Sequence, residues 1–128
     1  METRKHLAAE KKQQKTHNCA QAVICTYCDI CGLDEKTAEN VAGAFGSGMG
    51  NREGTCGSLV GAGMVLGLVT KDPVLARRRM KQVMERFRER NGATQCRMIK
   101  GIDTGIVLRD CTDCVADAAE FLEEFLPE

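Results

Sequence analysis

Residues 55–70 constrain the fold more than any other segment, because this run carries no charged side chain and is apolar on every side of a helix. A helix with no polar face has to be buried, yet this one is too short and too rich in glycine to span a membrane. Gly57, Gly61 and Gly63 would let neighbouring backbones approach it closely. We therefore predict a central buried helix over residues 56–69.

Other helices are predicted where apolar residues recur at helical spacing. Asp34 and Asp72 are placed to cap helix starts, and Gly32 and Gly92 are placed to end helices. The predicted helices cover residues 17–31, 34–45, 72–90 and 110–126, with one or two further turns within 94–99. We predict no strand. The expected fold class is all-α, a compact bundle of five or six helices around the glycine-rich apolar helix.

The length of 128 residues fits one domain that buries a core of its own. Residues 1–16 are expected to form a polar N-terminal segment, helical or frayed. Residues 17–128 are expected to form a single helical, cysteine-rich redox domain. The chain has no long linker, repeat or low-complexity tract that would divide it further.

Eight cysteines are the main chemical feature of the chain: Cys19, Cys25, Cys28, Cys31, Cys56, Cys96, Cys111 and Cys114. The first fifteen residues are polar and have no apolar centre, so we expect no secretory signal and a cytoplasmic location. Thiols stay reduced in the cytoplasm. Metal ligation or reversible redox chemistry is therefore expected rather than a disulfide framework.

Cys56 is predicted to lie at the start of the buried helix. The N-terminus of a helix carries partial positive charge and unpaired N–H groups, which favour a thiolate. The same N–H groups could donate to the sulfurs of a cluster and tune its potential. The alternative is that Cys56 packs as a small buried apolar residue.

Cys111 and Cys114 form a C-x-x-C pair at the start of the last predicted helix. Their side chains would be about 60° apart around the helix, and both border its apolar stripe. They are therefore expected to point toward the core or a site within it. Such a pair suits a dithiol couple or two metal ligands.

Cys25, Cys28 and Cys31 have the spacing of three-quarters of a [4Fe–4S] ligand loop. The fourth cysteine and its proline are missing, however. In a helix the three thiols would also spread over about 120°, with Cys25 on the face of Gln21 and Asp29. We do not expect a cluster on these residues.

The charge pattern excludes some partners and leaves others open. The formal net charge is zero and there is no aromatic cluster, so no nucleic-acid binding is expected. Residues 77–90 are mostly basic and residues 110–128 are acidic. These are expected to be two solvated helix faces that attract each other, or a docking face for a redox partner protein. A homodimer stays open, because the apolar helix could be buried across an interface.

Several short motifs resemble the C_GCAxxG_C_C family of redox-active proteins. They are residues 18–23 (NCAQAV), 48–50 (GMG) and 56–62 (CGSLVGA), followed by Phe87, Gly92, Cys96 and the last part from Cys111. The resemblance spans about residues 18–126, with Ser58 where the family commonly has alanine. It maps the four family cysteines onto Cys19, Cys56, Cys96 and Cys111. The family is also similar to part of split-Soret cytochrome c, which has an iron–sulfur cluster, so the resemblance implies a cluster such as [2Fe–2S] on those four cysteines.

Three functions fit these features. The first is electron transfer or redox sensing through an iron–sulfur cluster held by Cys19, Cys56, Cys96 and Cys111, with the loop 46–54 closing over it. The second is metal-free thiol–disulfide chemistry, with Cys56 as the low-pKa thiol and Cys111 or Cys114 as the resolving one. The third is a helical interaction module stabilised by zinc. No residue pattern identifies an enzymatic reaction.

Overall fold

The computed structural model describes residues 1–127, and their regular elements are helical. In chain order these are α1 (Lys5–Gln13), α2 (Cys19–Thr26), α3 (Cys28–Cys31), α4 (Glu35–Val41), the π-helical turn η1 (Gly48–Arg52), α5 (Gly57–Thr70), α6 (Pro73–Asn91), α7 (Cys96–Ile99) and α8 (Cys111–Glu123). The all-α prediction is confirmed. No helix in the described part of the chain is long and apolar enough to cross a membrane.

The helices within residues 1–127 outnumber the five or six that were predicted, because several are only one turn long. The helix predicted over 17–31 is interrupted at Tyr27, whose backbone leaves the helical conformation (φ −114°, ψ 19°). The Tyr27 side chain is fully buried, and its hydroxyl donates a hydrogen bond of 2.6 Å to Glu123 Oε2. This hydrogen bond joins the junction of α2 and α3 to the last residue of α8, and helical periodicity gives no sign of it.

The predicted helix boundaries depend on capping residues that the structure confirms. The Asp34 carboxylate accepts a hydrogen bond from the backbone N–H of Thr37, and Asp72 accepts from the second and third residues of α6. Gly32 and Gly92 end α3 and α6 in the left-handed conformation, with φ of 67° and 86°. Glycine adopts that conformation without a steric penalty.

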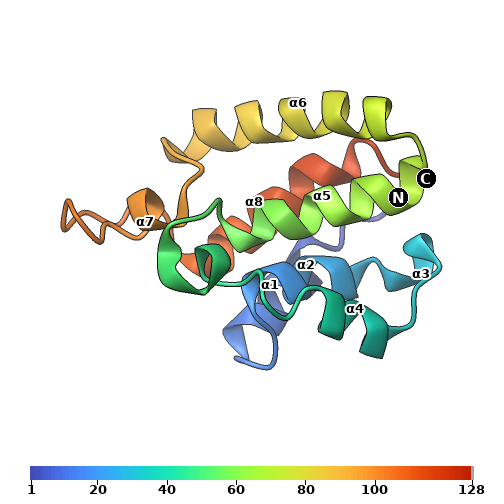
Figure 1. The fold of residues 1–128 in the computed structure, drawn as a ribbon, viewed down its shortest axis with the longest axis horizontal. Coiled ribbons are helices and arrows are strands. Elements are labelled where there is room, and N and C mark those ends of the chain that lie inside the picture. Colours follow the sequence, from blue (N-terminus) through green and yellow to red (C-terminus); the bar gives the residue numbers. More distant parts are fainter. Residues whose placement is uncertain (128) are drawn as a thin grey trace.

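The apolar helix α5 contacts α2, α6 and α8. Figure 1 shows α5 and α8 side by side in a middle layer, with α6 on one side and α1, α2 and α4 on the other. The side chains of α5 that carry this packing are fully buried: Leu59, Ala62, Val65 and Leu66. Burial on several sides explains why α5 lacks a polar face.

The contact between α2 and α5 depends on Gly61. A Cβ atom at this position would lie 2.7 Å from the carbonyl oxygen of Ala20 and 3.1 Å from Cβ of Val23. The first distance is shorter than side-chain atoms tolerate, so the two backbones can be this close only with glycine at position 61.

Gly61→Ala is expected to destabilise the protein by about 1–3 kcal/mol, because the added methyl group forces α2 and α5 apart. Gly67→Ala is the matched control on the same helix, since nothing lies within 4 Å of a Cβ there. This control should stabilise the protein by about 0.5–1 kcal/mol through helix propensity. Urea unfolding of both variants checks the prediction, and equal unfolding free energies would contradict it.

Candidate functional site

Five cysteines line one small enclosed cavity, which we call the five-thiol cavity. Its cysteines are Cys19, Cys56, Cys96, Cys111 and Cys114. All of these side chains are buried except Cys111, which is half-buried. The free volume is about 10 Å³, which is about the room for one water molecule. No disulfide joins any of the eight cysteines, all of which lie in the described part of the chain.

Four of these cysteines lie where a helix begins. Cys19, Cys96 and Cys111 are the first residues of α2, α7 and α8, and Cys56 is the residue that precedes α5. Cys114 lies about one turn into α8. The sequence analysis predicted helix starts at Cys56 and Cys111, and the structure brings all four of these cysteines to one cavity.

Backbone hydrogen bonds hold Cys56 and Cys96 side by side. The N–H of Cys56 donates to the carbonyl of Thr94 at 2.8 Å, and the N–H of Cys96 donates to the carbonyl of Gly54 at 3.0 Å. These two bonds form an antiparallel pairing between the short segments that precede α5 and α7. The pairing fixes two thiols that are forty residues apart in the chain.

The glycine-rich loop predicted over residues 46–54 packs against Cys96. Gly48 has a φ of +57°, and a Cβ atom there would lie 2.5 Å from Cβ of Cys96. Glycine is therefore required at this position both for its backbone conformation and for the close approach. Ser47, which precedes it, lines the five-thiol cavity.

Cys19 and Cys111 form one pair of interacting thiols. A hydrogen bond from Cys19 and the neighbouring ammonium group of Lys100 together lower the pKa of Cys111 to about 5 despite its partial burial. Lys100 Nζ is in close contact with Cys111 Sγ. The same hydrogen bond and burial raise the pKa of Cys19. Cys111 is therefore the thiolate of this pair, and Cys19 is the neutral donor.

Cys56 and Cys114 form a second pair. A hydrogen bond from Cys114 lowers the pKa of Cys56 to about 7 despite burial, with help from the side chain and N–H of Ser58 and the N–H of Leu59. The Ser58 hydroxyl lies 3.0 Å from Cys56 Sγ. The pKa of Cys114 is raised by its bond to Cys56 and by burial. Cys114 therefore has the largest effect on the Cys56 thiol, and the backbone N–H groups at the start of α5 add to it.

The spread of the five sulfurs bears on what the cavity can hold. A single tetrahedral zinc ion would place its ligand sulfurs about 3.8 Å apart, from zinc–sulfur bonds of about 2.3 Å. Within the described residues, the one set of three or more potential ligand atoms that lie within 4.8 Å of one another does not include these sulfurs. Four of the five sulfurs form two thiol pairs, with Cys96 outside both, rather than one tetrahedron. This arrangement suits a cluster with more than one iron or a pair of dithiols.

Cys25, Cys28 and Cys31 do not line the five-thiol cavity. Cys25 shares a helix face with Gln21 and Asp29 in sequence, but its side chain is buried and only 9% exposed. The reason is that α4 packs against α2 at this place. The sequence contained no signal for that packing.

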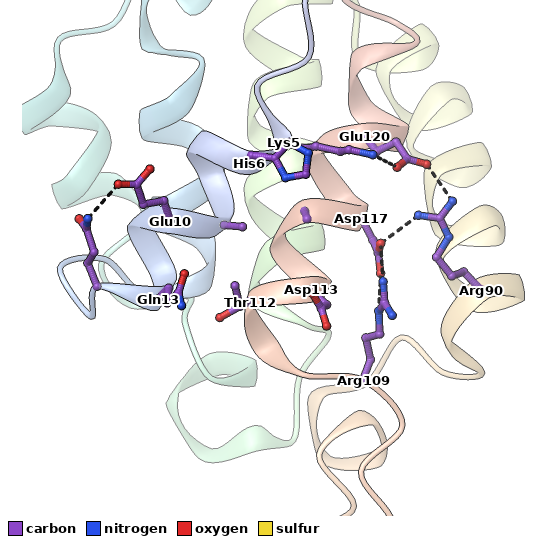
Figure 2. Close-up of a pocket in the computed structure, with 13 residues that line it drawn as sticks. Lys5, His6, Glu10, Gln13, Arg90, Arg109, Thr112, Asp113, Asp117 and Glu120 are labelled. Atoms are coloured by element: carbon purple, nitrogen blue, oxygen red, sulfur yellow. Dashed lines mark hydrogen bonds and ion pairs between the residues drawn. The ribbon is translucent and has the colours of Figure 1, made fainter.

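Figure 2 shows a larger, open groove between α1 and α8, with a cavity volume of about 910 Å³. Its charged groups are largely paired: Asp117 binds Arg90 and Arg109 at 2.9 and 3.0 Å, and Glu120 binds Arg90 and Lys5. Arg90 and Lys5 lower the pKa of Glu120 to about 2. The ion pairs of Arg90 join the basic face of α6 to the acidic face of α8, as the charge pattern suggested.

Two residues of the site were missed by sequence reasoning. Lys100 follows Cys96 by one helical turn, which could have been noted, but nothing in the sequence shows that Cys111 lies beside it. Ser58 was noted only as a departure from the family pattern, whereas its hydroxyl contacts the Cys56 thiol.

In the reduced, metal-free protein, iodoacetamide should alkylate Cys111 faster than the other thiols, because Cys111 combines a pKa of about 5 with partial exposure. Lys100→Met removes the neighbouring cation and raises this pKa, so alkylation at about pH 6 should slow several-fold. Lys81→Met, on the exposed side of α6, is the control. Mass-spectrometric mapping of the modified cysteines measures both effects. Equal alkylation rates of Cys111 in the Lys100→Met variant and in the wild-type protein would contradict the assigned effect of Lys100 on the pKa of Cys111.

Comparison with known proteins agrees with the motifs in the sequence. A family model described as "Putative redox-active protein (C_GCAxxG_C_C)" matches residues 17–125. This range contains all eight cysteines. No curated protein and no solved structure matches the chain. The resemblance noted in the sequence is confirmed, and the chain belongs to the C_GCAxxG_C_C family.

Proposed function

We propose that this protein transfers electrons or senses redox state through an iron–sulfur cluster bound in the five-thiol cavity. The proposed ligands are the four family-matched cysteines: Cys19, Cys56, Cys96 and Cys111. The observation that carries the proposal is the convergence of these four helix-start cysteines on one buried cavity. Such a cluster supplies one-electron oxidation and reduction when it is bound.

The surroundings of the cavity favour a negatively charged group. Thiolate ligands and bridging sulfides make such a cluster anionic, and α2, α5 and α8 all direct their positive ends toward it. Lys100 adds a cation at Cys111. Burial of the thiols keeps water away, and the S–H group of Cys114 is available to donate to the sulfur of Cys56. Hydrogen bonds of that kind shift the reduction potential of a cluster.

Insertion of a cluster requires the thiols to move apart, because the free volume is about 10 Å³. The parts of the wall that can yield are short elements: η1, with positive φ at Met49 and Arg52, and the single turn α7. Both lie on the loop side of the cavity, whereas α5 and α8 are held by the core. We infer that the cavity opens on the side of the loop 46–54.

Metal-free thiol–disulfide chemistry is the second candidate, because the thiols already lie in two pairs. Cys56 and Cys114 combine a lowered and a raised pKa, as expected for a reactive thiol and a resolving thiol. Oxidation of the pair to a disulfide would release two electrons and two protons to an external acceptor. Both candidates need a reducing compartment such as the cytoplasm to keep the thiols reduced.

We infer that a redox partner protein binds beside Cys111. A shallow hollow there is lined by Cys111, by the basic side chains of Arg52, Lys100 and Arg109, by Asp110, and by the apolar Ile102 and Val107. Val107 and the neighbouring Ile106 are 65% and 64% exposed and add to this apolar patch. An apolar patch with a basic rim suits a partner that has an acidic rim around its own redox centre.

The cluster proposal is tested by measuring iron and acid-labile sulfide in protein purified without oxygen. Cys19→Ser, Cys56→Ser, Cys96→Ser and Cys111→Ser should each lose most of the iron, because each removes one thiolate ligand. Cys31→Ser, outside the cavity, is the control and should retain it. Cys114→Ala should keep the iron and change the reduction potential. Iron loss in Cys31→Ser equal to that in Cys56→Ser would contradict the ligand set, and iron-free protein that reversibly loses two thiols would favour the dithiol function.

The docking surface is tested by the rate at which an acidic one-electron carrier protein reduces the cluster. Arg52→Glu and Val107→Asp should each slow this reaction several-fold at low salt, because they remove charge and apolar complementarity. Reduction by dithionite, which needs no docking surface, should be unchanged. Unchanged rates with the carrier protein would contradict this surface. A concentration-dependent dimer that Val107→Asp dissociates would show that a second copy of the chain covers it.

A further inference from the structure

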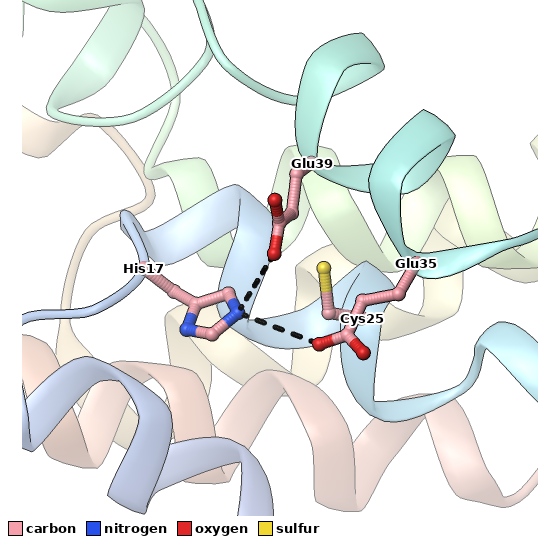
Figure 3. Close-up of side chains that lie close together, drawn as sticks. All are labelled: His17, Cys25, Glu35 and Glu39. Carbon is pink, nitrogen blue, oxygen red and sulfur yellow. Dashed lines mark ion pairs between the residues drawn. The ribbon is translucent and has the colours of Figure 1, made fainter.

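A second group of ligand-type side chains lies where α4 packs on α2. His17 comes from the segment before α2, Cys25 from α2, and Glu35 and Glu39 from one face of α4. One nitrogen, sulfur or oxygen atom from each of the four lies within 4.8 Å of the others. Figure 3 shows the four side chains directed toward one another. None of these residues lines the five-thiol cavity.

His17 directs its Nε2 toward this group. Its Nδ1 lies 2.7 Å from the hydroxyl of Thr16, and that hydroxyl lies 3.2 Å from the carbonyl of Lys11, to which it can donate. A neutral imidazole that donates from Nδ1 to Thr16 carries its lone pair on Nε2. Nε2 is buried and has no hydrogen-bond partner among the described residues. A buried ring nitrogen without a partner is unfavourable unless something binds it.

The distances fit a metal ion better than a hydrogen bond. His17 Nε2 lies 3.8 Å from an oxygen of Glu39 and 4.0 Å from an oxygen of Glu35, both too long for hydrogen bonds. Tetrahedral zinc with bonds of about 2.0–2.1 Å to nitrogen and oxygen separates these ligand atoms by about 3.3 Å. Movements of about 0.5 Å for Glu39 and about 0.7 Å for Glu35 would close that difference. Both glutamate side chains are partly exposed, so they have room to move by these distances.

The backbone under the site is held by polar bonds that fix α4 on α2. Gln21 Nε2 donates to the carbonyl of Glu39 at 2.9 Å. Asn18 Nδ2 donates to the carbonyls of Ala42 and Gly43, each at 3.2 Å. Glu35 and Glu39 are four residues apart on one helix face, so both carboxylates point to the same place. The positions of the donors are thus set before any ion binds, which reduces the cost of binding.

We propose a binding site for a divalent transition-metal ion made by four side chains: His17, Cys25, Glu35 and Glu39. One imidazole nitrogen, one thiolate and two carboxylates are a donor set that suits zinc, whose character is intermediate between hard and soft. The Thr16–His17 hydrogen bond is the outer contact that orients the imidazole. The ion would cross-link α2, α4 and the segment before α2. This site is independent of the cluster, because the two share no ligand.

The test uses the full chain, reduced and metal-free, with its histidines labelled with ¹⁵N and titrated with zinc chloride. The chain has two histidines, so His6 serves as an internal control for His17. We expect the Nε2 resonance of His17 to change from that of a lone-pair nitrogen to that of a metal-bound nitrogen, while His6 is unchanged. Zinc bound only in the five-thiol cavity would leave Nε2 of His17 as a lone-pair nitrogen, so the two sites are read separately.

Variants then identify the other ligands. Glu39→Gln, Glu35→Gln and Cys25→Ser should each weaken zinc binding at His17 about tenfold or more. Glu53→Gln and Cys31→Ser, which alter the same residue types outside this group, should not. Circular dichroism checks that each variant is folded. If Cys25→Ser does not fold, the two glutamate variants decide the question. An unchanged His17 resonance at saturating zinc would overturn the proposal. So would binding at His17 that is equally tight after both glutamates are replaced.

Discussion

The close contact of α2 with α5 is the constraint on which the rest of the structure depends. Gly61 allows the two backbones to meet, and the apolar side chains of α5 then fill the layer between α6 and the N-terminal helices. Because Cys19 is the first residue of α2 and Cys56 immediately precedes α5, their contact brings these two cysteines into one cavity. The same helix contact therefore packs the core and assembles the site, so a change that separates these helices should disturb both.

Polar interactions, in addition to core packing, place the other thiols at the cavity. Cys96 is placed by the two backbone bonds that pair its segment with that of Cys56. Cys111 and Cys114 arrive on α8, which the buried carboxylate of Asp117 ties to Arg90 and Arg109. The backbone bonds and the Asp117 carboxylate are largely shielded from water, so they hold these segments firmly in position. The loop side of the cavity has fewer such hydrogen bonds and ion pairs, which is why we place its opening there.

The sequence predicted the features that depend on local chemistry. Asp34, Asp72, Gly32 and Gly92 marked helix boundaries correctly, because capping is decided by a residue and its near neighbours. It did not predict the break at Tyr27, the contact of Lys100 with Cys111, or the group around His17. Each of these joins segments that become neighbours only after folding. The cysteines at helix starts come together only in the folded structure, and their spacing in the sequence does not predict that they meet.

Our central claim is that the five-thiol cavity binds an iron–sulfur cluster. The ultraviolet–visible spectrum of protein purified without oxygen, with iron and sulfide measured on the same sample, tests this most directly. The chain has no tryptophan and one tyrosine, so its own absorption is weak and confined to the ultraviolet. We predict visible charge-transfer bands with iron and sulfide in stoichiometric amounts. A colourless, iron-free protein from cells grown and broken without oxygen would contradict the claim.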